Sequence, residues 1–183
     1  AGGAGDMTPA ARVEAAITIL DRILGGDPAE QALLRWSRAS RFAGSGDRAA
    51  VRDLVFDSLR RLQSRAALGG AMTGRGLMLG MCREEGRAPQ SVFTGEGHAP
   101  APLNAAELAQ GGPPAAEAAL DLPGWILPAW HEALGDTADA VALAMRDRAP
   151  VWLRANLLRA TPAEAVAALA SDQIEAIPHP DLP

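Results

Sequence analysis

Arginine is the residue type in this sequence with the clearest potential for binding chemistry. All 17 basic residues are arginine, whose planar guanidinium binds phosphate through paired hydrogen bonds and stacks on bases. Eight arginines lie between Leu33 and Arg65, together with three acids. From this cluster we predict RNA-phosphate contacts for six residues: Arg38, Arg41, Arg48, Arg52, Arg60 and Arg61.

Two plainer explanations of the arginines stay open. The cluster is an ordinary solvated face if Asp47, Asp53 and Asp57 pair with it, and a GC-rich genome would account for the absence of lysine. Taken for the whole chain, the net charge of −5 argues mildly against a nucleic-acid partner, but the charge is unevenly distributed. The first 91 residues hold 13 arginines against 10 acids, and the remainder hold 4 against 12.

The other candidate motifs predict packing rather than chemistry. Gly74, Gly76 and Gly80 follow no strand, so we expect them to allow close helix contact and not to bind a dinucleotide. Cys82 lies among leucine and methionine residues and is predicted to be a core thiol. The three histidines are far apart, and no cysteine or histidine stands at ligand spacing, so no metal site is expected. The chain also lacks P-loop, G-x-S-x-G and H-E-x-x-H motifs, so we predict no catalysis by this chain itself.

Helices must position these residues. Hydrophobic residues make up 48% of the 183 residues and aromatic residues only 4%, which favours packed helices over a sheet sandwich. Caps, prolines and glycine pairs predict helices over residues 8–24, 27–42, 47–68, 75–85, 125–134, 136–148 and 161–170, with a short one after Asn104.

Two segments near the end predict strands instead. Residues 151–158 are rich in apolar and β-prone residues, and residues 174–177 form a weaker candidate. With the helix between them they would open an α+β unit, but two strands bury little surface alone. We therefore expect this chain to be part of a longer protein. The single cysteine and the lack of a long apolar run predict a cytoplasmic, reducing environment and no membrane span.

Several passages together resemble a known family. Residues 47–61 resemble the central helix of NusB-like domains, which are all-helical RNA-binding modules. Residues 93–103 resemble the front region of bacterial rRNA cytosine-5 methyltransferases of the Sun/Fmu or RsmB type. Residues 122–126 are similar to that family's Pro-x-Trp-Leu helix. Residues 150–156 and 161–164 are similar to its Arg-Val-Asn and Thr-x-x-Glu passages, with alanine replacing the usual valine.

The resemblance implies a mainly α fold with the following division. Residues 1–6 are a tag or disordered lead-in, 7–103 a NusB-like helical domain, 104–122 a linker, and 123–183 helices followed by a truncated α+β, RNA-recognition-like domain. Arg154 and Asn156 are further candidate contacts in that last part.

The resemblance further implies that this chain docks small-subunit rRNA for a methyltransferase domain that lies beyond it in the parent protein. In the family that later domain binds S-adenosylmethionine and carries two catalytic cysteines. The Pro-Cys and Thr-Cys motifs are absent here, so Cys82 inherits no such role and no cofactor is expected in this chain. Two alternatives remain: a NusB-type adaptor that binds protein without touching RNA, and a free-standing regulatory protein of 18.9 kDa.

Overall fold

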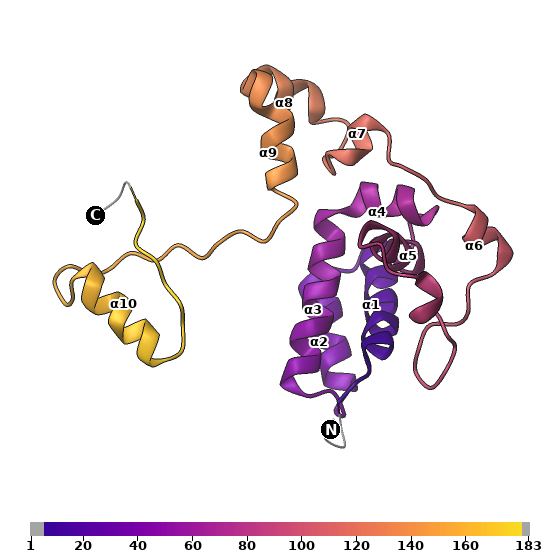
Figure 1. Ribbon diagram of the computed structural model, residues 1–183, viewed down its shortest axis with the longest axis horizontal. Helices are drawn as coiled ribbons and strands as arrows, with labels where there is room; N and C mark the ends of the chain where they lie inside the picture. Colours follow the sequence, from indigo (N-terminus) through magenta and orange to yellow (C-terminus); the bar gives the residue numbers. More distant parts are fainter. Residues whose placement is uncertain (1–5, 181–183) are drawn as a thin grey trace. The chain divides into compact units, whose positions relative to one another are not determined.

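The computed structural model describes residues 6–180, so the lead-in predicted for residues 1–6 lies almost wholly outside the described residues. The chain divides into two compact units, 1–148 and 149–183. The described residues are mainly α-helical and contain no strand (Figure 1). The helices of the first unit are α1 (Pro9–Leu24), α2 (Ala29–Ala39), α3 (Ser45–Arg60), α4 (Leu62–Gly69), α5 (Gly74–Glu84), α6 (Ala105–Ala109), α7 (Ala116–Ala119), α8 (Leu127–Leu134) and α9 (Ala138–Ala144), with 3-10 turns η1 (Pro89–Ser91) and η2 (Gly135–Thr137).

The core of the first unit forms around α5. This helix is apolar on nearly every side, and Leu77, Met78, Leu79, Met81 and Cys82 are all buried. A helix that is hydrophobic all round must lie in the interior, and α1, α3 and α4 accordingly pack against it. The amphipathic helices α1 and α3 each contribute one buried face. The core thiol predicted at Cys82 is thus confirmed.

Glycines allow α4 and α5 to come into backbone contact. A Cβ atom added to Gly80 would lie 2.0 Å from the carbonyl oxygen of Arg65, and one added to Gly69 would lie 1.8 Å from that of Gly76. Real Cβ atoms do not approach that closely, so only glycine fits. This confirms the prediction that the glycines near residue 74 serve helix packing.

The helix predicted over residues 47–68 is in fact two helices, divided at Arg61. The division has a distant cause, because the carboxylate of Asp121 accepts hydrogen bonds from the backbone N–H groups of Gln63 and Ser64, both at 2.8 Å. These are among the N–H groups that the first turn of α4 leaves without a helical partner. Asp121 therefore caps α4 from the segment between α7 and α8.

The turn between α2 and α3 also differs from the prediction. α2 ends at Ala39, and Phe42 lies outside it. The sequence predicts a helix that starts at Asp47, but α3 begins two residues earlier, at Ser45, and is preceded by Gly44. The carboxylate of Asp47 instead accepts the backbone N–H of Gly44 at 3.1 Å from within the first turn of α3. The predicted cap at Asn104 is confirmed, since it exchanges hydrogen bonds with Glu107.

The second unit corrects the strand predictions. It contains α10 (Pro162–Ser171), but residues 151–158 and 174–177 are not strands. Their apolar side chains are largely exposed, with Trp152 at 67% and Leu158 at 96%. A strand exists only when its backbone N–H and C=O groups pair with a neighbour, and the described residues supply no such ladder. The ring of Trp152, in the first of these segments, lies 4.9 Å from that of His179, which follows the second segment.

We predict that residues 151–155 exchange their amide hydrogens almost freely. No backbone hydrogen bond protects this segment in the described structure, so its exchange rates should lie within about tenfold of those of an unstructured peptide. The amides of α5 should be far slower and provide the internal reference. Hydrogen exchange read by NMR or mass spectrometry tests this, and strong protection of residues 151–155 would show that they are paired after all.

Candidate nucleic-acid interface

The ion pairs of Asp47, Asp53 and Asp57 determine which arginines of the cluster have a carboxylate partner among these three acids. Asp47 is buried, with 2% of its surface exposed. One carboxylate oxygen accepts the backbone N–H of Met7 at 3.1 Å and the Nε–H of Arg12 at 2.9 Å. Asp47 thus links Met7, α1 and the α2–α3 turn. It does not pair with its sequence neighbour Arg48.

The protonation of Asp47 reflects this setting. Burial by itself would raise the pKa of the Asp47 carboxyl, but the N–H groups of Met7 and Gly44 and the guanidinium of Arg12 outweigh it and hold the pKa below its ordinary value. Asp47 therefore stays ionised at neutral pH, with its charge compensated by Arg12.

Asp57 compensates the arginines at the other end of α3. It pairs with Arg61, with Arg60 at 3.4 Å and with Arg65 at 2.5 Å. Arg65 is 2% exposed and also pairs with Glu84 at 2.9 Å. Two of the six predicted contact residues, Arg60 and Arg61, are therefore held in a structural ion-pair network, and RNA contact by them would require those pairs to open.

Asp53 forms longer and more exposed ion pairs than Asp57 does with Arg61 and Arg65. It lies 3.5 Å from the guanidinium of Arg52 and 3.9 Å from that of Arg148, and all three side chains are at least half exposed. Exposed pairs of this kind contribute little free energy. Arg52 is accordingly only loosely held.

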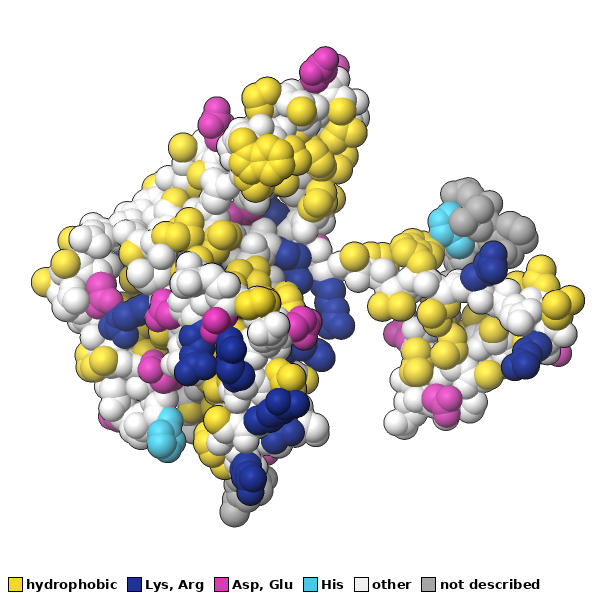
Figure 2. Space-filling model, turned by 180° about the vertical axis from the view of Figure 1, so that it is seen from behind, with side chains coloured by type: hydrophobic (Ala, Val, Ile, Leu, Met, Phe, Trp, Pro, Cys, Tyr) yellow, Lys and Arg dark blue, Asp and Glu magenta, His cyan; other side chains and the backbone are white. Residues whose placement is uncertain are grey.

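Three predicted residues remain without a carboxylate partner. Arg38, Arg41 and Arg48 are exposed, and no ion pair between residues 6 and 180 includes them. Arg38 lies in the last turn of α2, Arg41 in the turn that follows, and Arg48 in the first turn of α3. We call this region the α2–α3 end. Figure 2 shows arginine side chains spread over one face of the helical unit, with acidic side chains among them.

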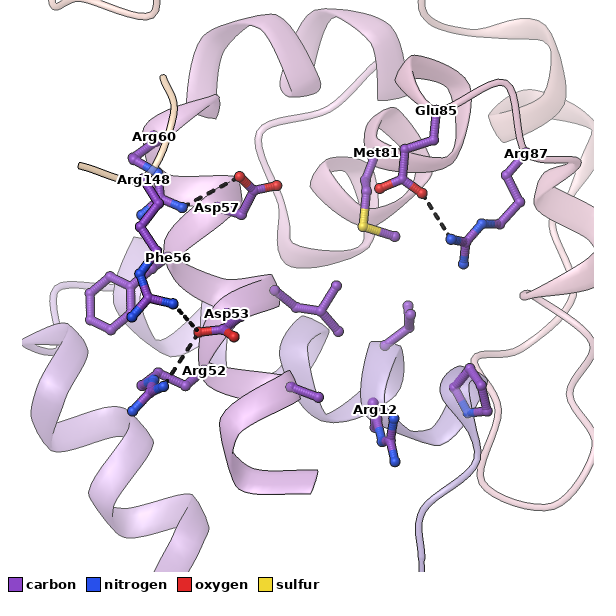
Figure 3. A pocket seen from close by; sticks show the side chains of 14 residues that line it. Arg12, Arg52, Asp53, Phe56, Asp57, Arg60, Met81, Glu85, Arg87 and Arg148 are labelled. Carbon is purple, nitrogen blue, oxygen red and sulfur yellow. Dashed lines mark hydrogen bonds and ion pairs between the residues drawn. The ribbon is translucent and has the colours of Figure 1, made fainter. Parts of the chain in front are cut away.

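A cleft of about 580 Å³ lies between α1, α3 and α5 (Figure 3). Val13, Leu54 and Met81 contribute apolar surface to it. Its arginines are Arg12, Arg52, Arg60, Arg87 and Arg148, and each of them has a carboxylate within 4 Å. The cleft is therefore less suited to phosphate than the α2–α3 end.

The remaining candidates fall outside this surface. Arg154 and Asn156 are exposed in the second unit, where Asn156 accepts the backbone N–H of Leu158 at 3.1 Å.

Burial raises the pKa of the Cys82 thiol, so thiolate chemistry is disfavoured there. Residues 6–180 hold no cluster of three or more metal-ligating side chains. In the same range, no helix has the length and apolar character that a bilayer span requires.

Phe42 is the residue that sequence reasoning missed. The helical pattern placed it at the end of α2, whereas the structure leaves its side chain 66% exposed beside Arg41. The available signal was its position just before the glycine- and serine-rich stretch that starts α3.

Comparison with known proteins identifies one part of the chain. Residues 122–183 match a family model described as Methyltr_RsmF/B-like, ferredoxin-like domain. This part of the chain is similar to a domain of RsmF/B-type methyltransferases. The match includes α8 and α9 as well as the second unit, and it identifies no catalytic domain. No curated protein and no solved structure gives a significant match to the chain.

Proposed function

We propose that this chain is the RNA-docking front region of an S-adenosylmethionine-dependent rRNA cytosine-5 methyltransferase, whose catalytic domain lies elsewhere in the parent protein. The observation that carries the proposal is the set of exposed arginines without carboxylate partners at the α2–α3 end. The RsmF/B-like match over residues 122–183 supports the methyltransferase context and, with it, small-subunit rRNA as the partner.

An arginine that already pairs with a carboxylate attracts RNA phosphates less than one that does not. Guanidinium groups that are not compensated within the protein displace counterions from RNA phosphates, which favours binding. Arg38, Arg41 and Arg48 meet that condition. Arg52 would contact phosphate as well, because opening its exposed pair with Asp53 costs little free energy. Such contacts fix the position of the RNA without reading its sequence. The choice of the target cytosine would therefore depend on other parts of the parent enzyme.

The glycine-rich segment that begins α5 does not suit the cofactor. Gly74, Gly76 and Gly80 in this segment pack against backbone carbonyl groups of α1, the α4–α5 turn and α4, respectively. No space remains there for a nucleoside. We therefore assign no step of methyl transfer to this chain.

The proposal predicts a charge-specific loss of RNA affinity. Replacing Arg38, Arg41 and Arg48 together by alanine should weaken binding to a labelled small-subunit rRNA segment roughly 10- to 100-fold at low salt. The slope of log affinity against log salt should fall by about 2 to 3, one for each lost phosphate contact. Fluorescence anisotropy at several salt concentrations measures both.

A second triple variant provides the matched control. Arg22 in α1, Arg87 after α5 and Arg159 in the second unit are exposed and belong to other segments than the α2–α3 end, and replacing them by alanine removes the same net charge. This variant should bind almost as well as the unmodified chain. Equal losses in the two triple variants would show that only overall charge matters and would contradict a defined surface.

The cleft between α1, α3 and α5 favours a second candidate function, that of a protein-binding adaptor. Apolar surface surrounded by already compensated arginines suits a protein segment better than a phosphate chain. A partner bound there would be insensitive to the Arg38, Arg41 and Arg48 substitutions. Loss of affinity for it on replacing Leu54 by aspartate would support this function.

A further inference from the structure

The side chain of Phe42 is exposed to solvent and is not part of the hydrophobic core. The chain has three phenylalanines; Phe93 is 2% exposed and Phe56 packs against the core, whereas Phe42 is 66% exposed. An exposed aromatic ring leaves a large apolar area in water, which costs free energy in the isolated protein. Its exposure is thus a feature that folding alone does not favour.

The backbone around Phe42 is held in place. Ser40 and Ala43 on either side are buried, at 7% and 4% exposure. The N–H of Ala43 donates to the carbonyl of Ser40 at 3.1 Å, and that of Gly44 donates to the Asp47 carboxylate at 3.1 Å. The ring therefore projects from a fixed turn, and binding through it would require little ordering of the backbone.

The arginines around the ring indicate which class of ligand it would contact. Arg41 directly precedes Phe42, Arg38 lies in the last turn of α2, and Arg48 lies in the first turn of α3. An aromatic ring among uncompensated arginines provides both interactions that single-stranded nucleic acids use, namely stacking on bases and attraction for phosphates. A duplex offers only the phosphates, because its bases are already stacked on one another.

We propose that Phe42 stacks on an unpaired base, so that the α2–α3 end binds single-stranded RNA in preference to duplex RNA. This inference rests on the proposed RNA-docking function and specifies its ligand. It assigns a base-contacting role to a residue that carries no charge.

The test compares two RNA probes with three variants of the full 183-residue chain. The probes are a labelled 12-nucleotide RNA of mixed sequence and the same strand annealed to its complement. The variants are Phe42→Leu, which keeps an apolar side chain but removes the ring, Phe42→Trp, which keeps an aromatic ring, and Arg48→Ala. Because Phe42 is exposed, none of the three should change the thermal unfolding temperature appreciably.

Stacking predicts a pattern that charge alone does not. Phe42→Leu should weaken binding of the single strand about 10-fold and leave duplex binding within about twofold. The salt slope should stay unchanged, since no charge is lost. Phe42→Trp should retain or improve single-strand affinity, and Arg48→Ala should weaken binding of both probes.

Two other outcomes are distinguishable. If Arg48→Ala weakens RNA binding while Phe42→Leu does not, the stacking role is overturned, the RNA-docking function stands, and the exposed ring is left for a protein partner. If the unmodified chain binds neither probe at low salt, the docking function itself fails, and the inference fails with it.

Discussion

Replacing Gly80 by alanine should destabilise the protein by about 3 kcal/mol, at the upper end of typical overpacking losses. The new Cβ atom would lie 2.0 Å from the carbonyl oxygen and 2.9 Å from the Cα atom of Arg65. Both are backbone atoms, so no side-chain rotation relieves the clash. α4 and α5 would have to separate, although alanine is the better helix former by about 1 kcal/mol.

Urea unfolding followed by circular dichroism measures this loss. Gly46→Ala is the matched control, because Gly46 also lies in a helix, α3, but has no atom within 4 Å of an added Cβ. That variant should be neutral or slightly more stable. If Gly80→Ala were as stable as Gly46→Ala, the close contact of α4 and α5 would be wrong.

Replacing Arg65 by alanine should cost about 3 kcal/mol, the lower end of the range for breaking a buried ion pair. Its guanidinium donates to Ser58 at 2.9 Å, to Glu84 at 2.9 Å and to Asp57 at 2.5 Å. Without it, two partly buried carboxylates lose a cation in the interior. Arg61 pairs with the same two carboxylates and limits the loss.

The same unfolding experiment tests this prediction. Arg52→Ala is the matched control, because the Arg52–Asp53 pair is about half exposed and should contribute at most about 1 kcal/mol. Equal stability of the two variants would contradict the contrast drawn between structural and free arginines. RNA affinity should respond in the opposite order once the Arg65 variant is shown to be folded.

Local signals in the sequence predicted most of the helical architecture. Thr8 before Pro9 and the Asn104–Glu107 and Thr161–Glu164 capping pairs each mark a helix start that the structure confirms. Interactions between distant residues escaped prediction. Nothing near Arg61 indicates that a carboxylate 60 positions later caps α4 and divides the third helix, because such a cap depends on how the chain folds back.

Ion pairs between distant residues also escaped prediction from the sequence. Asp47 is adjacent to Arg48 in sequence, yet it pairs with Arg12 from α1. Sequence reasoning grouped six arginines, but it could not separate those with carboxylate partners in the fold from those without. The strand predictions failed for a related reason. Apolar residues at 151–158 show that a segment suits a sheet, whereas a strand also needs a neighbouring strand with which to pair.

Ultraviolet crosslinking of the chain to a small-subunit rRNA segment, followed by peptide mass spectrometry, tests the central claim most directly. Because every basic residue is arginine, trypsin separates the α2–α3 end into short peptides bounded by Arg38, Arg41, Arg48 and Arg52. We expect crosslinks in these peptides, with Phe42 among the modified residues. Crosslinks found only in residues 149–180, or none at low salt, would contradict RNA docking by the α2–α3 end.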